Sequence, residues 1–169
     1  DTTNGDFAFD TKDNDGNPVQ LRKYASKQSV INECEESLRR LKTDYIDLYQ
    51  IHWPDSTTPV QETMEAVQKL LEQGKIRAAG VCNYSVDLME KAEEVLHLAS
   101  DQVPYSMVRR DIEEDVVPYC VDNEIGIIAY SPLQRGILTG KMHKGYTFNE
   151  GDTRPNSAFY QEPNFSRIN

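Results

Sequence analysis

The chain has 169 residues, of which 38% are hydrophobic and 27% charged, enough for one globular core and too few for two ordinary domains. With 18 basic and 28 acidic side chains, its net charge is −10, which disfavours binding to nucleic acid or to an anionic membrane surface. No apolar run approaches the roughly 18 residues of a membrane helix, so we expect a soluble chain with no membrane partner.

The first 42 residues predict a hairpin or loop followed by a helix. Residues 1–24 are polar, and two short runs containing apolar residues flank the turn-rich segment Asp13-Asn14-Asp15-Gly16, so we expect a loop or hairpin excursion there. From Ser26 to Lys42, apolar side chains recur at three- and four-residue steps. This spacing is typical of one face of an amphipathic helix.

A strand and a second helix are expected next. Residues 45–51 are rich in aromatic and β-branched side chains and predict a strand that ends at His52. Thr58 is the expected cap of the helix that follows, because Pro59 suits its first position and Gln61 completes a capping box.

A strand, a helix and a short strand follow. Gly74 supplies a left-handed residue that ends the second helix, and residues 76–83 predict a strand. Ser85 can cap a helix whose apolar residues recur at helical spacing, and a short strand is expected over residues 102–108.

The last periodic segments are a helix and a strand. The helix is expected to start at Asp111, with Glu114 at the capping-box position, and the strand covers residues 125–130. The sequence beyond these segments is polar and without periodicity. We therefore expect βα units over residues 25–142 and a polar loop over residues 143–169.

Strands that alternate with helices predict βα units and a parallel sheet of the α/β class. No glycine-rich G-x-G-x-x-G motif opens any of the helices, which disfavours a dinucleotide-binding Rossmann sheet. A (β/α) barrel is the stronger prediction, although only four of its eight strands can be counted in this chain.

The cysteines and histidines argue against a metal centre. Cys34, Cys82 and Cys120 form an odd set without a close pair, which suits neither a disulfide framework nor a four-ligand zinc site. The three histidines are too far apart in the sequence to share a helix. We expect no bound metal and a reducing compartment, the cytoplasm.

Polar side chains follow each of the four predicted strands. Functional residues in parallel βα folds lie at the carboxyl ends of the strands. A single histidine at such a place is better explained as a hydrogen-bonded structural group, but four successive polar strand ends favour a site. The residues concerned are His52, Cys82, Asn83, Gln102, Tyr105, Ser106, Tyr130 and Ser131.

Several motifs closely resemble those of the aldo-keto reductases. The resemblance covers most of the chain in the family's order and spacing, and it implies a (β/α)8 TIM barrel, here only about strands 4 to 7 with flanking helices. The motifs are Ser37-Leu38-Arg39-Arg40-Leu41, Asp44 to Asp55, Gly80-Val81-Cys82-Asn83-Tyr84, Ala129-Tyr130-Ser131-Pro132-Leu133 and Leu138-Thr139-Gly140-Lys141.

This resemblance implies reduction of an aldehyde or ketone substrate by hydride transfer from NADP(H), with NAD(H) as the alternative. The family uses a tyrosine as proton donor, a lysine and an aspartate that tune it, and a histidine that orients the carbonyl. Only the histidine maps onto this chain, as His52, and Trp53 beside it is a candidate wall of the substrate pocket. The other three groups map upstream of Asp1, so we expect the chain alone to be inactive and its free sheet edges to allow a homo-oligomer.

The same resemblance implies a set of cofactor contacts. The family's carboxamide-binding residues map onto Cys82, Asn83 and Gln102, with a cysteine where serine is commoner, and its stacking aromatic maps onto Tyr130. Ser131, Pro132, Leu133, Gln134 and Arg135 would lie along the pyrophosphate of the cofactor. Arg135 and Lys141 are cations available to its phosphate groups, and the alternative for both is solvated surface charge.

A second function is kept open by these motifs. A regulatory or scaffolding relative would keep the barrel and the cofactor without catalysis. The physiological substrate and the choice between NAD and NADP are not determined by this part of the sequence.

Overall fold

The computed structural model describes residues 4–143 and 145–168, which form two compact units. The first unit comprises residues 4–103 and 115–128. The second comprises the described residues of 104–114 and 129–168. Every helix in the described residues is too short or too polar to cross a lipid bilayer.

An antiparallel hairpin precedes the first helix and realises one of the two structures expected for the N-terminal segment. Its strands are β1 (Asp6–Lys12) and β2 (Pro18–Lys23). The Asp13 carboxylate closes the turn between them by accepting hydrogen bonds from the backbone N–H groups of Asp15 and Asn17, each at 2.9 Å.

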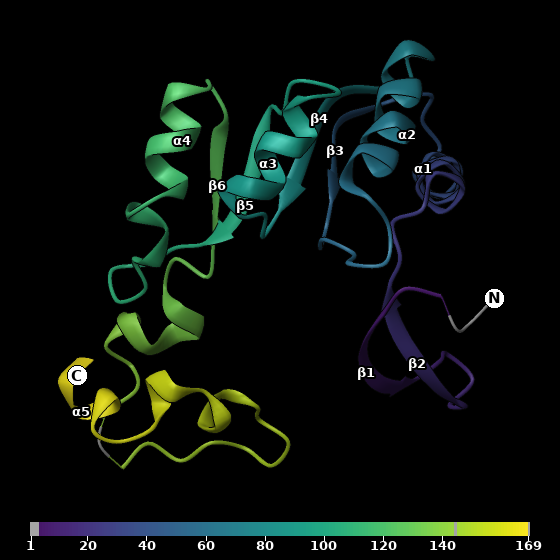
Figure 1. Ribbon diagram of the computed structural model, residues 1–169. Helices are drawn as coiled ribbons and strands as arrows, with labels where there is room; N and C mark the ends of the chain where they lie inside the picture. Colours follow the sequence, from purple (N-terminus) through teal and green to yellow (C-terminus); the bar gives the residue numbers. More distant parts are fainter. Residues whose placement is uncertain (1–3, 144, 169) are drawn as a thin grey trace. The chain divides into compact units, whose positions relative to one another are not determined.

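A four-stranded sheet forms the centre of the first unit, as the alternating pattern predicted (Figure 1). Its strands stand in sequence order: β3 (Ile46–Ile51), β4 (Ile76–Cys82), β5 (Ser100–Pro104) and β6 (Gly126–Tyr130). The pairs β3–β4 and β4–β5 are parallel. Parallel neighbours in sequence order bring their carboxyl ends to one edge of the sheet.

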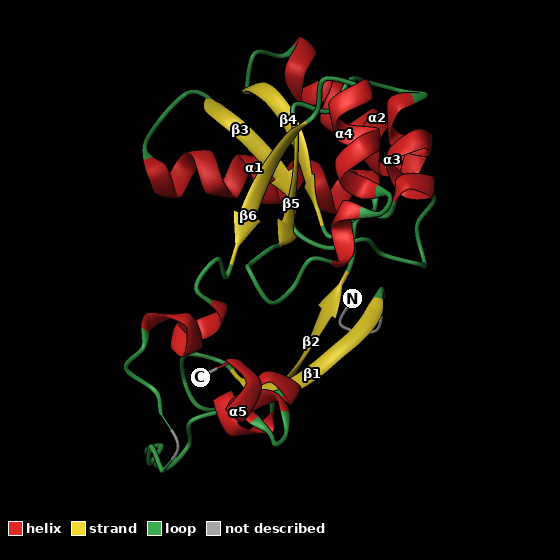
Figure 2. Cartoon of the chain, turned by 90° about the vertical axis from the view of Figure 1, so that its left-hand side faces the viewer, coloured by secondary structure: helices red, strands yellow, loops and turns green. Residues whose placement is uncertain are grey.

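Four helices accompany this sheet, and α2, α3 and α4 gather on one side of it (Figure 2). Their bounds are α1 (Lys27–Leu41), α2 (Val60–Glu72), α3 (Val86–Glu93) and α4 (Val116–Asp122). Apolar side chains at helical spacing, such as Met64 and Met89, are fully buried against the sheet side chains. Burial of this apolar surface is the main source of the sheet's stability.

Two expected helix starts differ from the structure, and a third has the expected N-cap residue without its side-chain hydrogen bond. The second helix begins at Val60 with Pro59 as its N-cap, and the Thr58 hydroxyl donates to the Asp55 carboxylate at 2.7 Å instead of capping. Ser85 is the N-cap of α3 but makes no side-chain capping bond. The helix expected from Asp111 is interrupted.

The interruption separates a short 3-10 turn from the true helix. Asp111–Glu113 form the 3-10 turn, and α4 starts only after Asp115, whose carboxylate accepts from the backbone N–H of Val116. Asp115 therefore takes the capping role that the sequence pattern assigns to Asp111.

The short strand expected over residues 102–108 is shifted toward the N-terminus. β5 runs from Ser100 to Pro104, since proline has no N–H to continue the ladder. Beyond it, Ser106 and Arg109 pair with each other as a tight turn.

The C-terminal segment is more ordered than the polar loop expected over residues 143–169. It contains two 3-10 turns and the short helix α5 (Asn164–Ile168). These elements pack around a small apolar cluster in the second unit, whose buried members are Ile137, Met142, Tyr160 and Phe165. Aromatic residues widely spaced in the sequence build this cluster, so periodicity gave no signal for it.

Candidate active site at the carboxyl ends of the strands

One face of the sheet carries a row of polar side chains set by the strand register. Gln50, Gly80 and Ser100 stand opposite one another on β3, β4 and β5. The Ser100 hydroxyl donates to the Gln50 amide oxygen at 2.9 Å across the glycine between them. A Cβ at Gly80 would lie 2.4 Å from the Ser100 Oγ atom, so this hydrogen bond requires glycine.

The next row toward the carboxyl ends pairs Cys82 with Gln102. The Cys82 thiol lies 3.8 Å from the Gln102 amide oxygen and 3.5 Å from the Gln50 amide nitrogen. Burial, reinforced by the nearby Asp101 charge, raises the pKa of the Cys82 thiol to about 11. The side chain therefore acts as a neutral, weak hydrogen-bonding group and not as a nucleophile.

His52 and Asn83 stand at the ends of β3 and β4. Asn83 leaves its strand with a left-handed φ of 60°, and its backbone N–H donates to the Gln102 carbonyl at 3.0 Å. Its side-chain amide donates to the His52 carbonyl at 3.4 Å. The His52 and Trp53 side chains are exposed, with ring centroids 6.1 Å apart. The first unit therefore brings together His52, Trp53, Cys82, Asn83 and Gln102.

Asp101 is a buried carboxyl group that the sequence reasoning missed. It is 0% exposed, and neither carboxylate oxygen has a hydrogen bond of good geometry among the described residues. Burial raises its pKa to about 7, although the backbone N–H groups of Tyr84 and Asn83 lower it in part. Its position in a strand, directly before the candidate residue Gln102, was the available signal.

The remaining candidate residues lie in the second unit, in a tight loop after β6. Ser131, Gln134 and Arg135 all have left-handed backbone angles, with φ of 55°, 46° and 56°. The backbone N–H of Gln134 donates to the Ser131 carbonyl at 2.8 Å. Three non-glycine residues held in this region within one loop indicate a conformation fixed by its surroundings, as is common at ligand sites.

The side chains of this loop differ in their availability to a ligand. Tyr130 is half-buried, and Pro132 and Leu133 are exposed. Gln134 is buried, and its amide oxygen accepts from the Ser106 hydroxyl at 3.0 Å. The Arg135 guanidinium donates to the Thr153 hydroxyl at 2.6 Å, and Lys141 is exposed.

A parallel βα sheet with polar strand ends, covered by helices on one side, defines a segment of a TIM barrel of the α/β class. A sequence model of the Aldo/keto reductase family matches residues 6–166. The chain belongs to this family.

Individual relatives agree with this assignment. Aldo-keto reductase YhdN of Bacillus subtilis (strain 168) is 45% identical over 94% of this chain and 46% of its own length. The NADH-specific methylglyoxal reductase of Escherichia coli (strain K12) is 37% identical over 88% of this chain and 46% of its own length. The chain thus spans about half the length of the curated relatives it matches.

Solved structures show the same likeness. The glycerol dehydrogenase AKR11B4 from Gluconobacter oxydans matches 95% of this chain and 49% of its own, with a TM-score of 0.87 and 41% identity. An aldo-keto reductase from Klebsiella pneumoniae in complex with NADPH matches 66% of this chain and 40% of its own, with a TM-score of 0.61 and 41% identity. The TIM-barrel fold is therefore shared at substantial sequence identity.

Proposed function

We propose that this chain supplies the carbonyl-orienting histidine and the nicotinamide-binding face of an NAD(P)H-dependent reductase of aldehydes or ketones. The observation that carries the proposal is the meeting of His52, Asn83 and Gln102 at the carboxyl ends of three neighbouring parallel strands. The family membership and the relatives' names, which include a methylglyoxal reductase and a structure with NADPH, support it.

The polar groups of the first unit suit a nicotinamide carboxamide. Asn83 and Gln102 both carry amides, which can donate to its oxygen and accept from its nitrogen. No described residue accepts a hydrogen bond from the Gln102 amide nitrogen, so this donor remains available to a ligand. The Cys82 thiol between them is too weak a donor to compete.

The proposed role of each residue combines these positions with the family resemblance, which assigns the stacking role to Tyr130. The bound nicotinamide would supply the hydride. Asn83 and Gln102 would hold its carboxamide, and Tyr130 would offer a flat aromatic face to the ring. His52, exposed beside Trp53, would donate a hydrogen bond to the substrate oxygen and stabilise the negative charge that develops there.

The test is steady-state reduction of a reactive aromatic aldehyde by the intact protein, with NADPH and NADH compared. His52→Ala should lower kcat/KM by roughly 10²-fold or more while leaving NADPH affinity nearly unchanged. His97→Ala is the matched control, because His97 is also exposed but contacts Glu93 on α3.

Two results would contradict the proposal. Equal loss of cofactor affinity and turnover in His52→Ala would make His52 a structural residue. Tight NADPH binding by the wild-type protein without reduction of any aldehyde or ketone would favour the regulatory or scaffolding alternative.

A further inference from the structure

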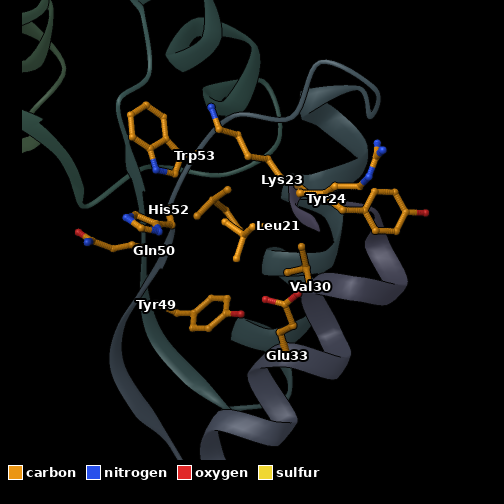
Figure 3. A pocket seen from close by; sticks show the side chains of 12 residues that line it. Leu21, Lys23, Tyr24, Val30, Glu33, Tyr49, Gln50, His52 and Trp53 are labelled. Carbon is orange, nitrogen blue, oxygen red and sulfur yellow. The ribbon is translucent and has the colours of Figure 1, made fainter. Parts of the chain in front are cut away.

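A cavity of about 230 Å³ in the first unit joins the candidate histidine to the N-terminal hairpin. Its wall includes His52 and Trp53 after β3, and Arg22 and Lys23 at the end of β2 (Figure 3). Two cations therefore line the same cavity as the exposed imidazole, in a chain whose net charge is −10.

Lys23 is held in place by an aromatic ring next to His52. Its ammonium nitrogen lies 4.3 Å from the centre of the Trp53 ring, within the range of a cation–π contact. Figure 3 shows the Lys23 side chain extending toward Trp53. The His52 and Trp53 ring centroids are 6.1 Å apart, so the imidazole and the ammonium group both lie near the same tryptophan ring.

The hairpin that carries Lys23 is tied to the segment that carries His52. The Asp6 carboxylate accepts from the Ser56 backbone N–H and from the Ser56 hydroxyl, each at 2.7 Å. Asp6 pairs with Lys23 in the hairpin register, so this contact anchors the end of the hairpin where the lysine stands. The position of Lys23 relative to His52 is thereby fixed at two points.

Neither cation forms a close ion pair among the described residues, although hydrogen bonds and, to a lesser extent, the charge of Lys23 lower the pKa of the neighbouring Asp6 carboxyl group. No described carboxylate lies within ion-pair distance of Lys23 or Arg22. The Arg22 guanidinium donates hydrogen bonds to the Gly5 carbonyl and to the Gln20 side-chain amide oxygen. Its buried Nε atom has no hydrogen-bond partner among the described residues. A buried cationic donor without a partner is costly, and an anion would relieve that cost.

The one acidic side chain on the cavity wall lies away from this cationic end. Glu33 on α1 accepts a hydrogen bond from the Ser29 hydroxyl at 3.2 Å. Figure 3 shows it beside Tyr49, at the end of the cavity opposite Lys23 and Trp53. The Glu33 charge therefore lies away from the region between His52 and Lys23.

We infer that the hairpin selects the substrate, and that Lys23 makes the site prefer carbonyl compounds bearing a carboxylate or phosphate group. This inference rests on the proposed function, because it assigns the substrate class of the same site. The carbonyl oxygen would meet His52, and the anionic group would meet Lys23, with Arg22 adding positive potential.

The experiment compares two aldehydes that differ chiefly in charge, 4-carboxybenzaldehyde and its neutral methyl ester, in the intact protein. Lys23→Gln should lower kcat/KM for the carboxylate roughly 10-fold or more and change kcat/KM for the ester by less than about 2-fold. Lys23→Arg should retain the preference, because guanidinium keeps both the charge and the cation–π contact.

Lys12→Gln is the matched control, since Lys12 lies at the opposite end of the same hairpin and outside the cavity wall. An equal loss for both aldehydes in Lys23→Gln, or an equal carboxylate-specific loss in Lys12→Gln, would overturn the inference. Either result would show that Lys23 acts through folding or through overall charge.

Calorimetric binding of 4-carboxybenzyl alcohol separates the two proposals. If no aldehyde is reduced but this alcohol binds about 10-fold more weakly to Lys23→Gln, the anion site stands and the reductase function fails. If aldehydes are reduced with no dependence on Lys23, the reductase function stands and the inference fails.

Discussion

Replacing Asp101 with asparagine tests the cost of burying its charge. The side chain is 0% exposed, both oxygens lack hydrogen bonds of good geometry within the described residues, and its pKa is raised from 3.8 to about 7. The folded protein therefore holds the proton more tightly than the unfolded chain. Stability from this group is fully present below pH 3.8 and is lost as the pH rises through about 7.

The magnitude follows from the pKa shift. Each unit of pH between the two pKa values changes the free energy of unfolding by about 1.4 kcal/mol. Between pH 5 and the folded-state pKa of about 7 there are two such units. The free energy of unfolding of the wild-type protein, minus that of Asp101→Asn, should therefore fall by roughly 3 kcal/mol between pH 5 and pH 8. The variant also buries an amide N–H₂ group at a cost of about 1–3 kcal/mol, but this cost is the same at both pH values.

The assay is urea unfolding of the intact protein and of the variant at pH 5 and pH 8. Other carboxyl groups shift the other way, such as Asp152, whose pKa is lowered to about 2 by its hydrogen bonds with Arg154. Only the difference in unfolding free energy between the wild type and Asp101→Asn isolates the contribution of Asp101. Asp87→Asn, which removes an exposed carboxyl group from α3, controls for the change in net charge. If the difference in unfolding free energy between Asp101→Asn and the wild type is the same at pH 5 and pH 8, the reasoning is refuted.

Two further predictions concern the strand ends. Tyr130→Ala should weaken NADPH binding roughly 10-fold in a fluorescence titration, since stacking on an aromatic ring contributes about 1–3 kcal/mol; unchanged affinity would remove Tyr130 from the proposed cofactor site. Gly80→Ala should lower the free energy of unfolding by about 1–3 kcal/mol, because the new Cβ would lie 2.4 Å from the Ser100 Oγ atom. Denaturant unfolding checks this effect, and full retention of stability would contradict the tight fit between β3, β4 and β5.

The sequence by itself determined the order of strands and helices and the place of the polar strand ends. Apolar residues at helical spacing produced α1 and α2 within one or two residues of the expected bounds, because one face of each helix must be buried. The motif around His52 and the Gly80-Val81-Cys82-Asn83-Tyr84 run were sufficient to indicate the family, which the comparisons confirmed. Such local patterns depend only on neighbouring residues.

Only the tertiary structure decided the features that depend on partners distant in the sequence. Thr58 has the chemistry of a helix cap, yet its hydroxyl donates to Asp55 instead. Asp115, and not Asp111, caps α4, which begins at Val116. The raised pKa of Asp101 arises from burial between elements. Likewise, Lys23 meets Trp53 only because the hairpin folds back beside the end of β3. The periodicity of apolar residues indicates which face of a helix or strand is buried. The pKa values, the hydrogen bonds and the shape of the cavity depend on which residues of other elements contact that face.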